Sequence, residues 1–331
     1  MIKIAQIGVG YWGPNLLRNL ASSSRCSLTH VAEKSADRRT FVSSSYPAIK
    51  IVNDSAEIFA SPEVDAVVIS TPAHSHHALA MAALSAGKHI LVEKPMATSV
   101  TEVEEIGRLA AEKGLVAMVG HTFLFNPAVR YLKQLMDSGD LGEIRYIYSQ
   151  RLNLGRIRSD VDALWNLAPH DISIIQYLLD NRAPLAIRRT GMDFVQKGID
   201  DVVFLNIEYP GKVLAHVHVS WLDPHKVRSL TVVGSKKMAI YDDMAEHKIA
   251  VYDKGIDPKA VLGQSMDYDQ VQPPSFVHRS GDIHCPAIVW KEPLKAEIDH
   301  FFDCIEGGVT CLTGPAHARE VVRILASAKT D

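Results

Sequence analysis

A glycine-rich turn near the start of the chain is the most specific chemical signal in the sequence. Three glycines stand in the order G-x-G-x-x-G, directly after an apolar run and directly before a helical pattern that opens with Pro14. In this context the first glycine permits a tight turn, the second lets a pyrophosphate approach the backbone, and the third lets the helix pack closely on the strand. The helix start offers N–H groups and a partial positive charge to phosphate. The pattern therefore predicts a dinucleotide site, lined by Gly8, Gly10, Tyr11, Trp12 and Gly13.

An acidic residue follows this turn at the spacing that is typical of a dinucleotide site. Glu33 comes 20 residues after Gly13, at the end of the second apolar run. A carboxylate there accepts hydrogen bonds from the adenosine ribose hydroxyls, which favours NAD over NADP. Lys34, Arg38 and Arg39 lie near enough to hold a 2'-phosphate if Glu33 turns away, so NADP stays an alternative cofactor. A glycine turn that binds nothing is the competing interpretation, and the combination of strand, spacing and acid argues against it.

A charged segment, Glu93-Lys94-Pro95, ends the apolar run His89–Val92. Ligands of an open α/β sheet bind beyond the carboxyl ends of the strands, so this segment is expected to face the cofactor. Pro95 biases Lys94 towards an extended backbone. An ammonium group held there can hydrogen-bond a substrate hydroxyl and stabilise negative charge on its oxygen. A solvated lysine at a strand end is the competing interpretation of the segment taken alone.

Alternating strand and helix patterns in the first third of the chain position these residues. Such alternation is typical of a parallel sheet with crossover helices. Beyond Gly120, one long helical pattern precedes strands joined by tight turns, as at Pro210-Gly211, which predicts an antiparallel sheet in an α+β domain. The expected strands are Ile2–Ile7, Leu28–Glu33, Ala66–Ser70, His89–Val92, Leu115–Val119, Val202–Tyr209, Val213–Trp221, Arg228–Val233 and Met238–Tyr241; the expected helices are Ser75–Ala86, Ser99–Lys113, Leu164–Leu179, Pro293–Glu306 and Pro315–Ala328; and Lys254–Pro286 is expected to be a long surface excursion.

Composition restricts the classes of protein to consider. The 331 residues, 47% hydrophobic and 22% charged, are typical of a globular protein of two domains with a large core. A formal net charge of −3 gives no broad attraction to nucleic acid or anionic lipid. Lys3 interrupts the first apolar stretch, and no later run approaches the roughly 18 apolar residues that span a bilayer. We therefore expect a cytoplasmic protein that has neither a nucleic-acid polymer nor a membrane as partner.

Cysteine and histidine spacing gives no metal motif. The four cysteines are scattered without CxxC spacing, so reduced thiols are expected, with neither a zinc site nor a disulfide framework. A histidine cluster after Thr71-Pro72 has no cysteine or carboxylate ligand beside it. We interpret His76 as lining the nicotinamide end of the cofactor site, and His74 and His77 as surface or packing residues. The residues concerned are Cys26, Cys285, Cys304 and Cys311, and His74, His76 and His77.

Several short segments, in order along the chain, resemble the glucose-fructose oxidoreductase and inositol dehydrogenase (Gfo/Idh/MocA) family. They are Gly-Tyr-Trp-Gly-Pro-Asn at 10–15, Thr71-Pro72 with His76, Ala86-Gly87-Lys88-His89, Glu93-Lys94-Pro95, Asn126-Pro127 and Glu292-Pro293-Leu294. The resemblance covers nearly the whole chain. It implies an α/β Rossmann domain, here 1–122, and an α+β domain with an open-faced, mainly antiparallel sheet, here 123–331, with the last helix able to pack back on the first domain. It also implies hydride transfer to or from nicotinamide, a sugar or cyclitol substrate, cofactor contacts from Ser70, Thr71, Pro72, His76, Glu93 and Lys94, and a substrate contact from Asn126.

The family's second catalytic segment typically carries an aspartate four residues before a histidine. Here the matching segment runs from Trp165 to Asp171; it retains His170 and has Asn166 in place of the aspartate. Helical i,i+4 spacing puts both side chains on one face, although Pro169 can distort the turn. An imidazole with an ordinary pKa of about 6.5 is suited to taking a hydroxyl proton as hydride leaves the same carbon. Asparagine carries no charge, and Asp171 lies about 100° round the helix from His170, so an Asp–His relay is in doubt.

Three arginines, Arg151, Arg156 and Arg158, shortly precede that segment. Guanidinium groups bind phosphate in a two-pronged fashion, so these residues are candidates to hold the diphosphate of a nucleotide sugar, next to Trp165. A solvated basic loop is the alternative interpretation.

The glycine-turn segment and the Trp165–Asp171 segment look closest to family members that act on nucleotide-linked sugars at C3. The resemblance thus predicts a sugar C3 dehydrogenase or ketoreductase, with Lys94 and His170 flanking the reacting hydroxyl. A cyclitol or free-sugar dehydrogenase is the alternative enzyme. A non-catalytic NAD-binding sensor is the alternative outside enzymology, and only Asn166 favours it. Because the family's sheet commonly pairs with its copy in another subunit, a homodimer or homotetramer is expected.

Overall fold

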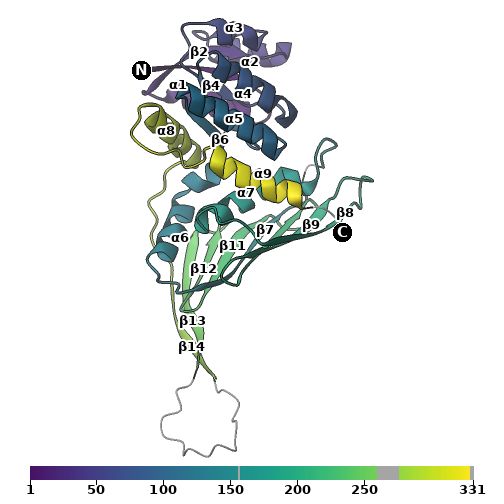
Figure 1. The fold of residues 1–331 in the computed structure, drawn as a ribbon, viewed down its shortest axis with the longest axis vertical. Helices are drawn as coiled ribbons and strands as arrows, with labels where there is room; N and C mark the ends of the chain where they lie inside the picture. Colours follow the sequence, from purple (N-terminus) through teal and green to yellow (C-terminus); the bar gives the residue numbers. More distant parts are fainter. Residues whose placement is uncertain (156, 259–275, 329–331) are drawn as a thin grey trace, which may run out of the picture. The chain divides into compact units, whose positions relative to one another are not determined.

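The computed structural model describes residues 1–155, 157–258 and 276–328 (Figure 1). The chain divides into two compact units. The first, here the N-terminal unit, comprises Met1–Pro127, Ile172–Asn181 and Trp290–Lys329. The second, here the sheet unit, comprises Ala128–Asp171 and Arg182–Val289. A functional boundary at residue 122 stays a prediction.

A six-stranded parallel sheet forms the centre of the N-terminal unit, in the order β3-β2-β1-β4-β5-β6. All four residues of β4 and of β6 are buried, as parallel strands covered on both faces require. The order changes direction at β1 and β4, so the carboxyl ends of these strands form the expected ligand crevice. The strands are β1 (Ile2–Ile7), β2 (Cys26–Ala32), β3 (Lys50–Val52), β4 (Ala66–Ile69), β5 (His89–Glu93) and β6 (Ala117–Gly120).

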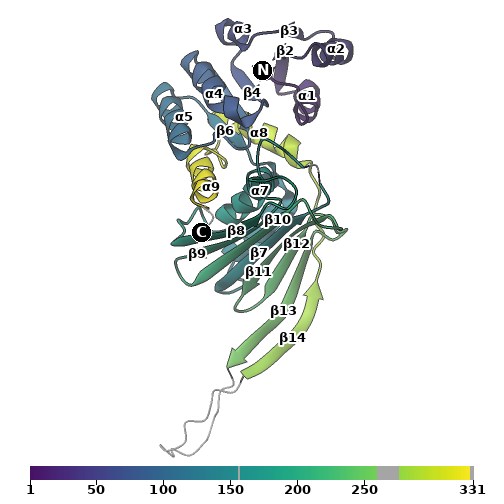
Figure 2. The same cartoon turned by 90° about the vertical axis from the view of Figure 1, so that its right-hand side faces the viewer.

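Helices cover both faces of this sheet: α1 and α2 lie on one side, and α4, α5 and α9 on the other (Figure 2). Their ends follow the sequence. Ser99 and Glu102 form a capping box at the start of α5, and Gly114, with φ of 64°, ends it. The helices are α1 (Gly13–Ser22), α2 (Ala36–Ser45), α3 (Ser55–Ala60), α4 (His76–Ser85), α5 (Val100–Lys113), α8 (Pro293–Ile305) and α9 (Pro315–Ser327), with short 3-10 turns at Ala73–Ser75 and Thr122–Phe125.

An eight-stranded sheet forms the sheet unit, in the order β14-β13-β12-β11-β7-β10-β9-β8 among the described residues. All its pairings are antiparallel except that of β7 with β10, which is parallel. Gly211, with φ of 82°, makes the expected hairpin turn between β9 and β10. The elements are α6 (Pro127–Asp137), β7 (Ile144–Leu152), α7 (Ala163–Leu178), β8 (Ala186–Met192), β9 (Val202–Tyr209), β10 (Val213–Ser220), β11 (Val227–Gly234), β12 (Met238–Asp242), β13 (Ile249–Pro258) and β14 (Phe276–His284).

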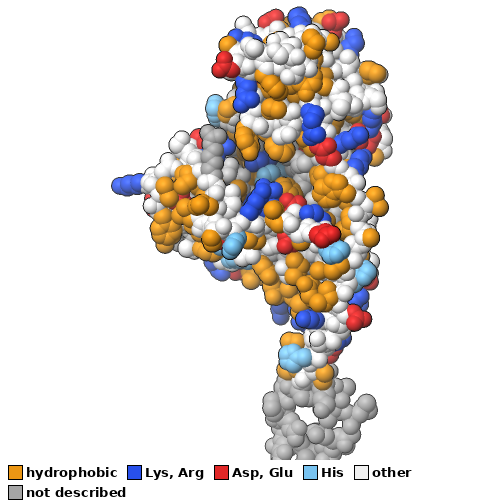
Figure 3. All heavy atoms as spheres, turned by 180° about the vertical axis from the view of Figure 1, so that it is seen from behind, with side chains coloured by type: hydrophobic (Ala, Val, Ile, Leu, Met, Phe, Trp, Pro, Cys, Tyr) orange, Lys and Arg blue, Asp and Glu red, His pale blue; other side chains and the backbone are white. Residues whose placement is uncertain are grey.

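The two faces of this sheet differ in burial. Along β9, Val203, Leu205 and Ile207 are fully buried, whereas Phe204 between them is 39% exposed. On the open face the ring of Phe204 stacks on His218 of β10, with centroids 4.3 Å apart. Hydrophobic side chains gather over the sheet unit in the space-filling view (Figure 3). The expected open-faced, mainly antiparallel sheet is therefore confirmed.

The expected surface excursion over Lys254–Pro286 is wrong in part. Its first residues belong to β13, and Phe276–His284 forms β14, which pairs with β13 from Val251 to Pro258. The Pro, Gly and Asp content of the segment hid strands that are stabilised by each other rather than by an apolar pattern. The remaining residues, 259–275, lie outside the described part of the chain. Among the described residues, no helix is long and apolar enough to cross a bilayer.

Candidate active site

The glycine turn leads from β1 into α1, and each of its glycines meets a different constraint. Gly8 has a φ of +90°, and a Cβ there would lie 2.8 Å from the carbonyl oxygen of Ser70. A Cβ on Gly13 would lie 3.0 Å from the carbonyl oxygen of Gly8, so this glycine permits the close approach of helix and strand. Gly10 is exposed, and a Cβ there would meet no atom within 4 Å. Gly10 thus borders open space on the side where a pyrophosphate would approach.

Side chains from β1 and from the end of β4 hold this turn in shape. Gln6, fully buried, donates from Nε2 to the carbonyl oxygens of Gly8 and Gly13 at 2.9 and 3.0 Å. Ser70 Oγ donates to the same Gly8 oxygen at 2.7 Å. Ser70 therefore supports the turn from the neighbouring strand. Gln6 was missed in the sequence, where a polar residue inside an apolar strand gave no sign of its partners.

Glu33 lies at the end of β2 and points at the glycine turn. Its Oε2 accepts the Val9 N–H at 2.6 Å, and its Oε1 accepts the Ser35 N–H at 2.8 Å. Each carboxylate oxygen keeps a second lone pair for a ribose hydroxyl. Arg39 is directed elsewhere, because its Nη1 donates to the carbonyl oxygens of Glu33 and Lys34 at 3.0 and 2.6 Å. Of the basic residues considered for a 2'-phosphate, Lys34 and Arg38 are exposed.

The start of α1 has the features of an anion site. Among the described residues no side chain caps this helix, whereas Ser35 caps α2 and Ser99 caps α5. Pro14 has no N–H and the Asn15 N–H donates to the Trp12 carbonyl oxygen at 3.0 Å, so the Gly13 N–H is the donor of the first turn that a phosphate would take. The open space beside Gly10 and the carboxylate of Glu33 complete the requirements of the adenosine diphosphate half of NAD. The residues present fit this cofactor.

Glu93 and Lys94 follow at the end of β5, two strands from β1. The Lys94 N–H donates to Glu93 Oε2 at 3.1 Å, and the Trp12 side chain of the glycine turn lies close enough to this carboxyl to lower its pKa. Burial raises the pKa of the Glu93 carboxyl to about 7, although the residue as a whole keeps partial exposure. The contact with Trp12 links the glycine turn to the segment that carries Lys94.

A second buried acid, Glu297 of α8, lies near Glu93. Its Oε2 accepts a hydrogen bond from Thr122 Oγ1 at 2.8 Å. Burial raises the pKa of the Glu297 carboxyl well above its ordinary range, and the charge of Glu93 adds to the rise. Glu297 was missed in the sequence, since it is 204 residues from Glu93 and belongs to no motif. Both carboxyls therefore favour the neutral form more than an exposed glutamate does.

His76 of α4 contacts the segments that follow two strands, β4 and β5. Its ring, 1% exposed, places Nδ1 2.7 Å from the carbonyl oxygen of Pro95 and Nε2 2.8 Å from that of Thr71. Both ring nitrogens therefore face backbone carbonyl oxygens, and a neutral imidazole donates to one of the two. His76 thus helps to position the Lys94-Pro95 segment, and its contact with the cofactor stays a prediction. Pro72, by contrast, is exposed, and Asn126 is buried directly before α6.

The second candidate segment lies on α7, which continues through Pro169 as a regular helix. Asn166 and His170 therefore share one face, as the i,i+4 spacing predicts. Asn166 Oδ1 accepts a hydrogen bond from Trp221 Nε1 at 3.3 Å, which fixes the orientation of its amide. Asp162 Oδ1 accepts the Trp165 N–H at 2.9 Å at the start of the helix.

The three arginines have different surroundings. Arg151 is 5% exposed and donates from Nε to Asp171 Oδ2 at 2.6 Å, on the helix-covered face of the sheet. It is therefore held in a buried ion pair, and we do not retain it as a phosphate ligand. Arg158 is exposed and pairs with Asp160, Nη2 to Oδ2 at 2.6 Å. Arg156 lies outside the described residues.

Family comparisons agree with this geometry. The sequence model of the oxidoreductase family with an NAD-binding Rossmann fold matches residues 2–121, and the model of the GFO/IDH/MocA C-terminal domain matches residues 129–240. The chain belongs to the Gfo/Idh/MocA oxidoreductase family. Its glycine turn, Glu33 and Lys94 all lie within the matched NAD-binding region.

Individual relatives are diverse. The chain is 32% identical over 184 residues to a 4-carboxy-2-hydroxymuconate-6-semialdehyde dehydrogenase from Sphingobium, covering 53% of this chain and 58% of the relative. It is 32% identical over 200 residues to a UDP-N-acetylglucosamine 3-dehydrogenase from Acidithiobacillus ferrooxidans, covering 60% and 61%. A solved structure of that enzyme from the same organism superimposes with a TM-score of 0.80 at 23% identity, covering 99% of this chain and 97% of the other, which shows the shared fold. The alignments thus span about three fifths of these curated relatives.

Proposed function

We propose that this Gfo/Idh/MocA member transfers a hydride between NAD and C3 of a nucleotide-linked hexose. The observation that carries the redox part is the placement of Lys94, at the end of β5 and next to a carboxyl that the glycine turn contacts through Trp12. The alignment with a UDP-N-acetylglucosamine 3-dehydrogenase supports the substrate class.

Each proposed residue has one task. Bound NAD supplies the hydride acceptor. Lys94 donates a hydrogen bond to the reacting oxygen and holds it in place. His170 takes the hydroxyl proton as the C–H bond breaks, and in the reverse direction it returns that proton to the carbonyl oxygen. Asn166, oriented by Trp221, can hydrogen-bond the sugar but holds no charge, so the proton rests on His170 alone.

Deuterium transfer tests the proposal. The full chain is incubated with NAD and UDP-N-acetylglucosamine carrying deuterium at C3, and the NADH formed is analysed by mass spectrometry. We expect deuterium in the NADH and a ketone at C3 of the sugar. Unlinked N-acetylglucosamine and myo-inositol are run in parallel. Faster turnover of inositol than of the nucleotide sugar contradicts the substrate class, and NAD binding without turnover of any of them favours the sensor alternative.

A further inference from the structure

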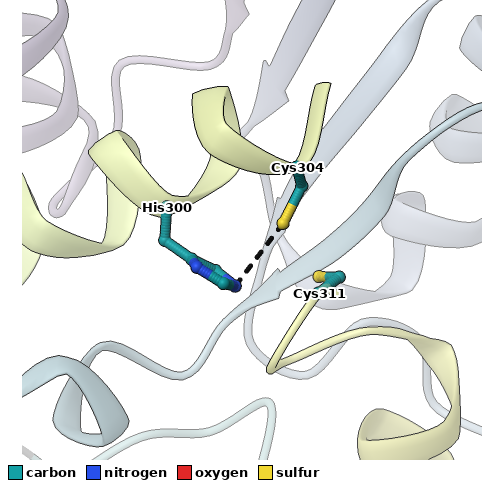
Figure 4. A group of neighbouring side chains, drawn as sticks. All are labelled: His300, Cys304 and Cys311. Carbon is teal, nitrogen blue, oxygen red and sulfur yellow. Dashed lines mark hydrogen bonds between the residues drawn. The ribbon is translucent and has the colours of Figure 1, made fainter. Parts of the chain in front are cut away.

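Three side chains with metal-binding atoms meet in the N-terminal unit, and none of them belongs to the proposed active site. They are His300 and Cys304 of α8 and Cys311 of the segment between α8 and α9. One nitrogen and two sulfur atoms lie within 4.8 Å of one another. Figure 4 shows His300 and Cys304 projecting from α8 towards Cys311. We propose that this group binds a single zinc ion through His300, Cys304 and Cys311.

The backbone brings the three residues together without help from an ion. His300 and Cys304 are four residues apart and share one face of α8. Gly307, with φ of +78°, ends the helix, and its N–H donates to the Cys304 carbonyl oxygen at 3.2 Å. The chain then turns back, and the Thr313 carbonyl oxygen accepts the Val119 N–H of β6 at 2.9 Å. The position of Cys311 is thus fixed by the end of α8 on one side and by the hydrogen bond between Thr313 and β6 on the other.

The observed distances suit a tetrahedral ion. With Zn–S of about 2.3 Å and Zn–N of about 2.0 Å, tetrahedral angles place sulfur and nitrogen about 3.6 Å apart and the two sulfurs about 3.8 Å apart. Cys304 Sγ lies 3.5 Å from His300 Nε2, so one edge already has the required length. The edges to Cys311 are at most 4.8 Å, so a shift of this one side chain by about 1 Å completes the set.

The histidine is oriented for metal binding. The Leu312 N–H donates to His300 Nε2 at 3.0 Å, which selects the tautomer with the proton on Nδ1 and the lone pair on Nε2, the nitrogen nearest Cys304 Sγ. The Phe125 ring packs against the imidazole, with centroids 5.3 Å apart. A metal ion would compete with the Leu312 N–H for this lone pair, so binding would require that hydrogen bond to break and the segment at Leu312 to shift.

The donor set suits zinc. Two thiols and an imidazole form a borderline-soft set of the kind that zinc prefers. Cys304 is buried, whereas His300 and Cys311 are partly exposed, so solvent can supply the fourth ligand. A bound cation deprotonates a coordinating thiol directly.

Cobalt titration tests this site without reference to activity. The reduced, chelator-treated full chain is titrated with Co²⁺, and the thiolate-to-cobalt charge-transfer band is followed. We expect one Co²⁺ per chain, tetrahedral visible bands and full displacement by Zn²⁺. Zn²⁺ should also raise the Tm of the wild-type chain, because it binds the folded state.

Variants decide which residues hold the ion. Cys311→Ser and His300→Gln should each weaken Co²⁺ binding by at least about tenfold and abolish the Tm rise. They carry more weight than Cys304→Ser, since Cys304 is buried and its loss can disturb folding. Cys285→Ser is the matched control, because Cys285 is exposed and lies in the sheet unit.

Three outcomes overturn the proposal. One is the absence of a saturating charge-transfer band at stoichiometric Co²⁺, and another is a band that survives Cys311→Ser. The third is a chain that binds no Co²⁺ and instead forms a Cys304–Cys311 disulfide under a mild oxidant, which would make the group a redox pair.

Discussion

Arg151 and Asp171 form a two-pronged ion pair in the interior of the sheet unit, with Nε 2.6 Å from Oδ2 and Nη2 3.4 Å from Oδ1. Arg151 is 5% exposed and Asp171 3%. The pair joins β7 to α7, the helix that carries Asn166 and His170. Because both side chains are buried, each charge is stabilised by the opposite charge of its partner rather than by water.

Removing one partner of this pair should be costly. Asp171→Asn leaves a buried guanidinium without its carboxylate, and we expect the free energy of unfolding to fall by about 3–5 kcal/mol in urea denaturation. The double variant Arg151→Met/Asp171→Leu should lose much less, because it leaves no unpaired charge. Arg188, in an exposed pair with Glu208, is the control, and Arg188→Met should cost about 1 kcal/mol or less. A loss below about 1 kcal/mol for Asp171→Asn would show that water reaches the pair.

Two glycines of the turn are expected to affect different properties: Gly10 the binding of NAD, and Gly8 the stability of the fold. Gly10→Ala meets no protein atom, so we expect an unchanged Tm but at least about tenfold weaker NAD binding, because the new methyl group occupies the space of the pyrophosphate. Gly8→Ala is the contrasting variant. Its positive φ and the 2.8 Å approach to Ser70 should lower the Tm by several degrees. Calorimetric titration and thermal denaturation distinguish the two effects; wild-type NAD affinity in Gly10→Ala would place the phosphates elsewhere.

Much of the active-site half of the molecule was predictable because its signals are local. The glycine turn, Glu33 and Lys94 each follow a strand whose apolar pattern marks it, and parallel strands bring their ends together. The capping box at Ser99 and the turn at Gly211 were equally local. The carboxylate of Asp171 binds Arg151.

What escaped prediction depends on contacts between distant segments. Gln6 and Glu297 look like ordinary polar residues until the fold brings the glycine turn and Thr122 to them. Arg151 was expected at a phosphate, and no local pattern distinguishes a buried arginine from a solvated one. β14, which is almost wholly exposed, is held by its pairing with β13 rather than by an apolar face. The His300 group is joined by a helix end and a chain reversal, which no spacing motif encodes.

Glu93 predicts a pH dependence of stability. Its pKa is about 7 in the folded chain against an ordinary value of 4.5, so between these values the folded state holds a proton that the unfolded state has lost. The contribution of Glu93 to stability therefore falls as pH rises from about 4.5 through 7, by at most about 3 kcal/mol, and levels off above a pH of about 8. Glu93→Gln should be relatively more stable than wild type at pH 8 than at pH 5, as measured by urea denaturation. An equal difference at both values would contradict the raised pKa.

Of the two candidate arginines that the structure describes, Arg151 and Arg158, the second is exposed, and its pairing with Asp160 is weak enough to leave it available to a diphosphate. Arg158→Ala should raise KM for UDP-N-acetylglucosamine by about tenfold or more and leave KM for the unlinked sugar unchanged. Arg188→Ala, from another exposed pair of the sheet unit, should change neither. If both substrates respond alike to Arg158→Ala, the residue does not contact the diphosphate.

The central claim is that Lys94 and His170 act on the hydroxyl from which the hydride leaves, and steady-state kinetics of their variants test it most directly. Lys94→Met keeps the length of the side chain but removes every donor, and His170→Ala removes the proposed base. Measured with the substrate that turns over, kcat should fall by about 100- to 10,000-fold in each variant. NAD affinity, determined by calorimetry on the same preparations, should stay near that of the wild type. Turnover near the wild-type rate in both variants would contradict the account.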